Sequence, residues 1–447
     1  MKHPRSLPLT FVMFLLSVPH LVLLCSVFTA ANPLQYNYPR AVPINRSFRH
    51  RPPTHILSVF QPGMIKWEIQ SLPFKYRNVQ GYLRDISSFD GVLNHIAVEE
   101  EIAEHPISLP PVPAPRSMPL EDYISDNMDV MYYGLLGVGT PSQSLSVDID
   151  TGSADFWLPV KCTNCYNRQF DDAQSSTCRS SDESFSVYYG SGSVFGTIMQ
   201  DTITLDGLQV SDVYFGAASA VYGDFVELPN DGLLGMAFSN ISQSKKPTLF
   251  ETLVNKQLIP ASMFSLHLAR NQAKGSELYL GGIDPFKVTG PVTWIPLLSK
   301  AYWSVSMDAI TINAHTVLPT LGTCAIVDSG TTLIYLPASH ASAFYAMIPS
   351  AKPAPDYGPE FYSYRCSDVL DIAFSFGGHS FSINQADFNL GRTSQGSSDC
   401  VGGILALGDG FPSDIAIIGD EFLKSWYSTY DSSGVGRVGF SPDINNT

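Results

Sequence analysis

The sequence is short of positive charge. It holds 26 Lys and Arg residues against 41 Asp and Glu, which gives a formal net charge of −15 at pH 7. A protein that binds nucleic acid needs a basic surface to neutralise phosphates, so nucleic acid is excluded as a partner.

Long hydrophobic runs are also absent, except at the start. Lys2 and Arg5 precede an apolar run from about Leu9 to Phe28, which ends in small residues at Thr29–Ala31. This pattern predicts a secretory signal peptide over residues 1–31, which is removed, so that the mature chain has no membrane contact. The alternative is an uncleaved anchor, but the small residues behind the run favour cleavage. We expect a secreted protein, with delivery to a vacuole or lysosome as the alternative.

Cysteine is scarce, and its even number is informative. Six cysteines remain once Cys25 leaves with the signal, and an even number in a secreted chain indicates disulfides. Cys162-x-x-Cys165 has no second Cys or His pair nearby at ligand spacing, so we expect no metal site and no cofactor. Three Asn-x-Ser/Thr sites predict a glycoprotein; they begin at Asn45, Asn240 and Asn445.

Charge and proline divide the remaining chain. Residues 32–118 hold nine Lys or Arg against seven Asp or Glu, whereas residues 119–447 hold fifteen against thirty-four. Between about residues 99 and 119 lie three consecutive glutamates, Glu99–Glu101, and then six prolines, a composition typical of an exposed linker. We predict a basic pro-segment with its linker over residues 32–118 and an acidic body in two lobes, 119–300 and 301–447.

The body has few long helical periods. Its β-branched and aromatic runs of four to eight residues, punctuated by Gly, Asp, Asn and Ser, predict an all-β fold. Short helices are expected around Thr248–Leu258, Ala338–Ile348 and Asp420–Trp426.

One motif occurs twice. Asp150-Thr151-Gly152-Ser153 and Asp328-Ser329-Gly330-Thr331 each follow a β-branched run that predicts a buried strand. Each copy is followed, some 85 to 91 residues later, by two apolar residues and a glycine, at Gly235 and Gly419. The duplication predicts two related lobes that bring two carboxylates together.

In these motifs, and in the Gly-rich run around Tyr189-Gly190-Ser191, the chain resembles the pepsin-like aspartic proteases (peptidase family A1) from about residue 121 to 440. The resemblance implies a bilobal, double-lobed β-barrel fold with the active-site cleft between the lobes. It also implies an aspartic-type endopeptidase (EC 3.4.23 class) with Asp150 and Asp328 as catalytic pair. Two close carboxyls share one proton, so one can take a proton from water while the other stabilises the oxyanion.

The resemblance also assigns supporting roles. Gly152 and Gly330 leave room around the carboxylates, Ser153 and Thr331 bind their outer oxygens, and Thr151 and Ser329 bond to the opposite lobe's backbone. The flap and the substrate-binding residues are Tyr189, Gly190, Ser191, Asp148, Trp157, Phe225 and Thr332, with Leu228 as an alternative to Phe225.

The resemblance gives more specific expectations for Trp157, Asp148 and Ser191. The Trp157 indole is expected to support the Tyr189 hydroxyl, with a plain core tryptophan as the alternative. Asp148 takes a place where an acidic residue admits lysine in some fungal members, whose flap also carries an Asp where this chain has Ser191. Because that second carboxylate is missing, we expect a preference for large hydrophobic or aromatic residues around the cut.

The resemblance further implies disulfides Cys366–Cys400 and Cys162–Cys165. Cys324 and Cys178 either pair with each other or both stay free.

The leader does not align with a pepsin pro-segment. Lys75-Tyr76 is similar to the Lys-Tyr pair that blocks the dyad of pepsinogen, but its position far upstream of the body indicates a chance match. The charge asymmetry still predicts that the leader inhibits the body at neutral pH and detaches in acid.

We therefore expect a monomeric zymogen of an endopeptidase that acts on proteins and peptides at acid pH. The alternatives are a catalytically inactive relative that binds peptides or proteins, and a structural or adhesive extracellular β protein in which the two turns are incidental.

Overall fold

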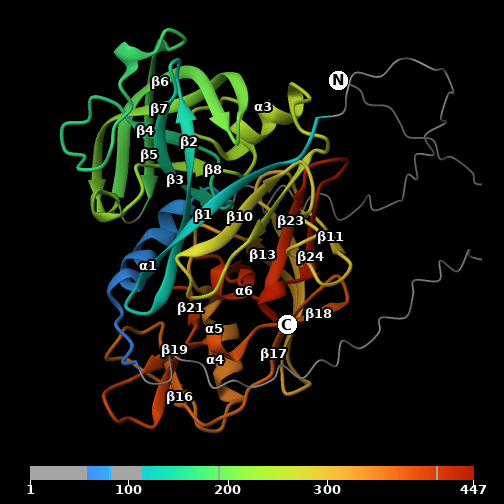
Figure 1. Cartoon of the computed structure of the whole chain (residues 1–447). Coiled ribbons are helices and arrows are strands. Elements are labelled where there is room, and N and C mark those ends of the chain that lie inside the picture. The colour runs from blue at the N-terminus through green and yellow to red at the C-terminus, as the bar shows by residue number, and fades with distance from the viewer. Residues whose placement is uncertain (1–57, 80, 82–112, 190–191, 409–410, 447) are drawn as a thin grey trace, which may run out of the picture. The chain divides into compact units, whose positions relative to one another are not determined.

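The computed structural model describes residues 58–79, 81, 113–189, 192–408 and 411–446; the predicted signal peptide lies outside them. Within these ranges no helix combines the length and apolar character needed to cross a bilayer. The described chain is mainly β, as predicted, with short helices (Figure 1).

The largest sheet has thirteen strands within the described residues. Their order is β11-β24-β23-β9-β10-β1-β2-β3-β8-β4-β7-β6-β5. Their bounds are β1 Arg116–Ser125, β2 Met128–Val138, β3 Gln143–Asp150, β4 Phe156–Pro159, β5 Arg179–Tyr189, β6 Gly192–Leu205, β7 Leu208–Gly223, β8 Gly232–Gly235, β9 Met263–His267, β10 Lys274–Leu280, β11 Thr293–Pro296, β23 Trp426–Asp431 and β24 Arg437–Pro442. Strands β23 and β24 come from the second predicted lobe but belong to the same sheet as strands of the first, so this sheet contains residues from both sides of residue 300. The lobe boundary at residue 300 stays a prediction.

Two smaller sheets complete the described β structure. A seven-stranded sheet has the order β18-β17-β12-β13-β22-β14-β21, and a four-stranded sheet has the order β15-β16-β20-β19. Their bounds are β12 Ser304–Ile312, β13 His315–Val327, β14 Ile334–Leu336, β15 Lys352–Pro353, β16 Tyr362–Arg365, β17 Ile372–Phe376, β18 His379–Ser382, β19 Asn389–Arg392, β20 Asp399–Gly402, β21 Ile404–Ala406 and β22 Ile415–Ile418.

The helices are short. They are α1 Gly63–Lys75, α3 Leu249–Asn255, α4 Ala338–Ala346, α5 Gln385–Phe388 and α6 Asp420–Leu423, with 3₁₀ turns at Asp172–Gln174, Asp224–Glu227, Ser239–Ile241 and Ile444–Asn446. The three predicted helices are confirmed as α3, α4 and α6, and α3 begins with a capping box between Thr248 and Glu251.

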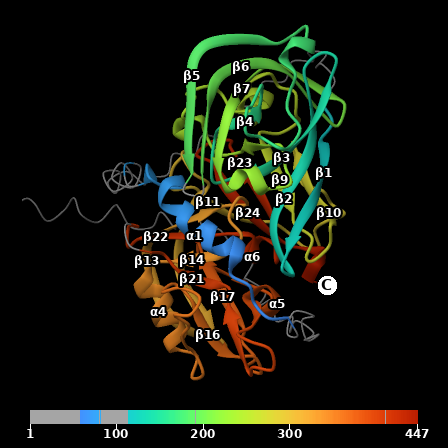
Figure 2. The same cartoon turned by 90° about the vertical axis from the view of Figure 1, so that its left-hand side faces the viewer.

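Helix α1 was not predicted. It lies in the leader, and its apolar residues Ile65, Ile69 and Leu72 follow the spacing of one helical face. Figures 1 and 2 show α1, in blue, between the part of the chain drawn in green and the part drawn in orange.

The ends of the two motif strands next to the aspartates, residues 145–150 and 323–327, are buried on both faces. Strand β3 pairs in parallel with β8, so that Asp150 faces Gly235, and β13 pairs in parallel with β22, so that Val327 faces Ile418. Continuous apolar runs suit such covered, parallel strands, which explains why each aspartate follows an unbroken β-branched run. The equivalent pairings also explain the second repeat: each apolar-apolar-Gly segment lies beside the strand that presents an aspartate.

A buried cluster of charges ties the last helix to the first strands. Lys424, just after α6, lies 2.9 Å from Asp129 on β2 and 3.0 Å from Glu421. Asp122 on β1 is buried nearby, and burial together with the charge of Asp129 raises its pKa to about 9.

Candidate active site

The two motif aspartates end equivalent strands and are held in the same way. Asp150 ends β3 and Asp328 follows β13 directly. The backbone N–H groups of Gly152 and Gly330 each donate to Oδ1 of the preceding aspartate over 2.9 Å. The Oδ2 atoms also have matching partners, since Ser153 donates to Asp150 Oδ2 over 2.6 Å and the Thr331 hydroxyl donates to Asp328 Oδ2.

The two turns are interlocked across the pair. The Thr151 hydroxyl donates to the carbonyl of Val327 over 3.0 Å, and the Ser329 hydroxyl donates to the carbonyl of Ile149 over 2.6 Å. Each hydroxyl also accepts the backbone N–H of the other residue, over 2.9 and 3.2 Å. Thr151 and Ser329 are both buried, so their hydrogen bonds are protected from water and hold the two turns in a fixed position relative to each other.

The glycines allow the close approach. A Cβ added to Gly152 would overlap the carboxylate of Asp328, and a Cβ added to Gly330 would overlap that of Asp150. Each carboxylate therefore lies against the backbone of the opposite turn, as the sequence-based interpretation of these glycines requires.

A lysine from the leader lies between the two carboxylates. Lys75, the last residue of α1, places Nζ 2.9 Å from Asp150 Oδ1 and 2.8 Å from Asp328 Oδ2, and donates to the carbonyl of Gly330 over 3.0 Å. The hydroxyl of Tyr76 donates to Asp328 Oδ2. Because one ammonium contacts both aspartates, their oxygens face a common point.

The expectation that Lys75-Tyr76 is a chance match is therefore wrong. Distance along the chain was a poor guide, because residues 82–112 provide ample length to return from α1 to β1. The signal that could have shown the docking is the helical spacing of Ile65, Ile69 and Leu72, which gives the leader an apolar face to bury.

The contacts shift the acidity of each group. Burial alone would lower the pKa of Lys75, but the charges of Asp150 and Asp328 raise it above its ordinary value, so the amine stays charged. Burial alone would likewise raise the pKa of Asp328, yet the Lys75 charge and the hydrogen bonds from Lys75, Thr331 and Tyr76 lower it to about 2. For Asp150 burial prevails, and its pKa is raised despite the Lys75 charge.

A second leader residue binds beside the pair, and the sequence analysis missed it. Glu68 on α1 accepts the backbone N–H of Thr332 over 2.6 Å, that of Leu333 over 3.3 Å and the hydroxyl of Tyr335 over 2.7 Å. Burial raises the pKa of Glu68, and these hydrogen bonds offset only part of the shift. The leader thus occupies the backbone donor of Thr332, a residue predicted to bind substrate.

Aromatic residues line the cavity above the aspartates. The ring of Phe225 lies 4.9 Å from that of Tyr189 and 5.7 Å from that of Trp157, both nearly edge-on, and Leu228 lines the same cavity. The indole nitrogen of Trp157 and the phenol oxygen of Tyr189 are both buried and make no close hydrogen bond among the described residues, although the indole still acts to lower the pKa of the phenol against the larger effect of burial. Gly190 and Ser191 lie outside the described residues.

Asp148 lines this cavity two residues before Asp150. Its side chain is 8% exposed, and its Oδ1 has no hydrogen-bond partner in the described part of the chain. Burial and then the charge of Asp150 raise the pKa of Asp148 well above its ordinary value. A carboxyl in this setting stays neutral in acid and adds no charge to the cavity wall.

The cysteines form the two disulfides that the resemblance implies. Cys162 pairs with Cys165, and Cys366 pairs with Cys400. Cys178 and Cys324 do not pair with each other; both are free thiols, which was one of the two alternatives. Among the described residues, no group of three or more His, Cys, Asp or Glu side chains could hold a metal ion.

Comparison with known proteins agrees with this geometry. The family model of eukaryotic aspartyl proteases matches residues 131–443. An aspartic protease of Phaffia rhodozyma is 37% identical over 321 residues, which cover 70% of this chain and 76% of that protein. The embryonic pepsinogen of Gallus gallus is 32% identical over 374 residues (81% and 93%), and cathepsin D of Clupea harengus is 32% identical over 385 residues (82% and 93%).

The paired carboxylate turns, their interlocked hydroxyls and this similarity over most of the sequence agree: the chain belongs to the eukaryotic aspartyl proteases, and it is an aspartic-type endopeptidase.

Proposed function

We propose that the chain is the zymogen of a secreted endopeptidase that acts in acid, with Asp150 and Asp328 as its catalytic residues and its own leader as inhibitor. The observation that carries the proposal is the position of Lys75, whose ammonium contacts both carboxylates and occupies the point where a water would have to lie.

Once Lys75 has left, the two carboxyls can hold one proton between them. The ionised carboxylate takes a proton from a water as the water attacks the peptide carbonyl. The protonated partner donates a hydrogen bond to the oxygen on which negative charge develops, and the amine leaves with a proton from the pair. Ser153 donates to Asp150 Oδ2 and Thr331 donates to Asp328 Oδ2, so each carboxyl group is held in a fixed orientation beside the other.

Acid would release the leader through this same pair. The charge of Lys75 acts to lower the pKa of both carboxyls, to about 2 for Asp328 and against the larger effect of burial for Asp150, so the pair binds protons less readily with the cation than without it. The docked state therefore holds fewer protons on the pair than the undocked state, and docking weakens as the pH falls. Glu68 acts in the opposite sense: its raised pKa means that the docked state holds its proton more firmly, so acid favours docking at that contact.

The cavity supports a preference for large apolar side chains next to the cut. Tyr189, Phe225 and Leu228 supply its apolar wall, and Asp148 is held neutral by burial. Departure of Glu68 frees the backbone N–H of Thr332, which can then donate a hydrogen bond to a main-chain carbonyl of a substrate.

The test uses the processed protein and casein at pH 3 to 5, with and without pepstatin. We expect pepstatin-sensitive cleavage that is lost, with folding preserved, in Asp150→Asn and in Asp328→Asn. Absence of pepstatin-sensitive cleavage by the wild type would favour a peptide-binding protein without activity. Sequencing the N-terminus of secreted material tests the signal peptide and the processing site.

A further inference from the structure

The leader is held at a second place, away from the aspartates. Residues Ser58–Phe60 lie beside β19, the outermost strand of the four-stranded sheet, and form a parallel bridge with it. The backbone N–H of Phe60 donates to the carbonyl of Arg392 over 2.8 Å, and the N–H of Arg392 donates to the carbonyl of Ser58 over 2.8 Å. The leader thus adds a short strand to an open sheet edge.

The side chain of Phe60 fills an aromatic pocket next to that edge. It is 4% exposed, and its ring lies 5.3 Å from that of Tyr357 and 5.8 Å from that of Phe361. Strand pairing would accept almost any sequence, whereas this pocket selects a large apolar ring at one position.

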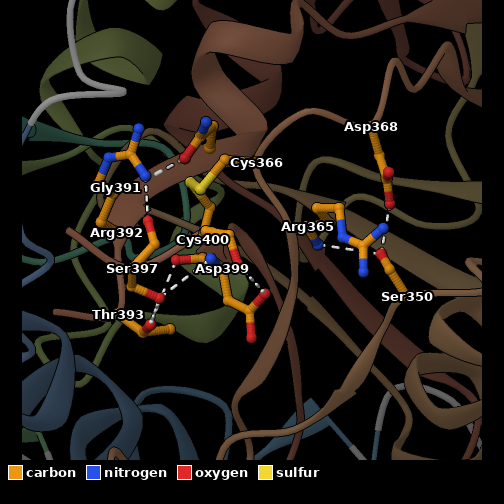
Figure 3. Close-up of a disulfide and its surroundings, with 12 residues drawn as sticks. Ser350, Arg365, Cys366, Asp368, Gly391, Arg392, Thr393, Ser397, Asp399 and Cys400 are labelled. Carbon is orange, nitrogen blue, oxygen red and sulfur yellow. Dashed lines mark hydrogen bonds between the residues drawn. A yellow bond between two sulfur atoms is a disulfide. The ribbon is translucent and has the colours of Figure 1, made fainter.

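The local structure of β19 leaves room for a strand to pair with it. Gly391 has φ +119, and a Cβ there would lie 3.1 Å from the carbonyl oxygen of Ser58 and 3.3 Å from the nitrogen of Phe60, so glycine gives the incoming strand its space. In the sheet register Arg392 faces Cys400, whose disulfide to Cys366 fixes the neighbouring strand β20 (Figure 3). The Arg392 guanidinium donates to the carbonyl of Ser397, which holds its side chain over the same loop.

We propose that this edge, formed by β19 with the pocket of Tyr357 and Phe361, is a second peptide-binding site of the processed enzyme, and that it takes an extended substrate segment bearing an aromatic residue. The inference rests on the proposed function, because activity requires Lys75 to leave the aspartates and departure of the leader then uncovers the edge.

The path of the leader argues for substrate as the occupant. Only two residues separate Phe60 from α1, and α1 runs directly to the aspartates, so the edge and the cleft are joined along one continuous chain. Thirteen helical residues span about 20 Å, a distance that an extended chain covers in about six to eight residues. A substrate in the cleft can therefore reach the edge with a stretch of that length.

The first experiment measures binding in the full-length chain and needs no activity. The probe is a dye-labelled peptide with the sequence of residues 56–62. In the wild type the leader fills the edge, whereas Phe60→Ala weakens that contact and leaves Lys75 on the aspartates. We expect Phe60→Ala to bind the probe about tenfold more tightly than the wild type, because the competing leader strand has lost its anchor.

The controls separate the edge from the rest of the surface. Adding Tyr357→Ala or Gly391→Val to Phe60→Ala should abolish the gain, and circular dichroism identifies any variant that fails to fold. Adding Tyr166→Ala, which removes an aromatic ring that is 84% exposed elsewhere, should leave the gain intact. A probe with alanine at the phenylalanine position should not bind. Equal affinity of the wild type and Phe60→Ala for the probe would overturn the proposal.

The second experiment uses the processed enzyme and two substrates with the same cleaved stretch. One carries Ser-Val-Phe about seven residues before that stretch, and the other carries Ser-Val-Ala. We expect a KM about tenfold lower for the first, and no difference in Tyr357→Ala. Equal KM values in an active wild-type enzyme would overturn the second site alone, whereas absence of turnover on both substrates would contradict the proposed function and leave the binding result standing.

Discussion

Replacing Lys75 by methionine tests the proposed inhibitory contact directly. Methionine keeps an unbranched side chain of similar reach and removes the ammonium that contacts Asp150 and Asp328. The two carboxylates, 2% and 0% exposed, then face each other across a site that has lost its cation.

The size of the effect follows from the burial of the contact. Removing one partner of a buried ion pair costs about 3 to 5 kcal/mol, and the lower end applies here because the aspartates can take up a shared proton. A loss of about 3 kcal/mol corresponds to roughly a hundredfold change in the ratio of open to closed precursor.

Binding of labelled pepstatin to the intact precursor at pH 5.5 measures that ratio. The apparent dissociation constant equals the intrinsic constant divided by the open fraction, so Lys75→Met should bind pepstatin about a hundredfold more tightly than the wild type. Gel electrophoresis before and after each titration verifies that the precursor is uncleaved. Lys66→Met is the matched control, because Lys66 lies on the same helix, is exposed, and forms no salt bridge within the described residues.

The variant should also respond less to pH. In the wild type, docking is lost as the pH falls from the ordinary range of a carboxylate towards the value of about 2 that Asp328 has in the docked state. Without Lys75 most of that dependence disappears. The reasoning is refuted if Lys75→Met binds pepstatin no better than the wild type, or if Lys66→Met gains as much.

Three further predictions concern other groups. Glu68→Gln removes a buried carboxylate whose raised pKa makes docking of the leader costly at neutral pH. The intact Glu68→Gln precursor should therefore bind pepstatin more weakly than the wild type at pH 7 and equally at pH 3. Tighter pepstatin binding by the variant at pH 7 would contradict this. Asp122, whose pKa is raised to about 9, contributes stability that is lost as the pH rises through that value, so the thermal midpoint should fall between pH 4 and 9 in the wild type and much less in Asp122→Asn. Removing the disulfide with Cys366→Ser and Cys400→Ser frees a loop of 34 residues and should lower the free energy of unfolding by about 4 kcal/mol, seen as a lower urea midpoint; an unchanged midpoint would contradict the loop-closure argument.

The body of the fold and the arrangement of the two turns could be predicted from sequence because both depend on local rules. Each β-branched run had to be a covered strand, and each Asp-Thr/Ser-Gly had to end one, so the repeat alone placed Asp150 and Asp328 in equivalent positions. The roles of Thr151 and Ser329 came only through the resemblance, since nothing local indicates which carbonyl a hydroxyl will reach across a cleft.

The leader contacts could not be predicted in the same way. Glu68 and Phe60 have no local signature, because their partners are separated from them by hundreds of residues and are chosen by the docking of α1 as a unit. Lys75-Tyr76 does have a signature, and only its distance along the chain from the body argues against a role. The long linker removes that objection, because closing a longer flexible loop adds little entropic cost.

The interlock of Thr151 and Ser329 has a consequence for motion. The four buried hydrogen bonds lie at the floor of the cleft, directly beneath the aspartates. Any rotation that separates the two turns would have to break all four of these bonds together, so a rotation that keeps them needs an axis close to them. Such a rotation would move residues far from the axis most and would leave the separation of the Asp150 and Asp328 carboxyl groups nearly unchanged.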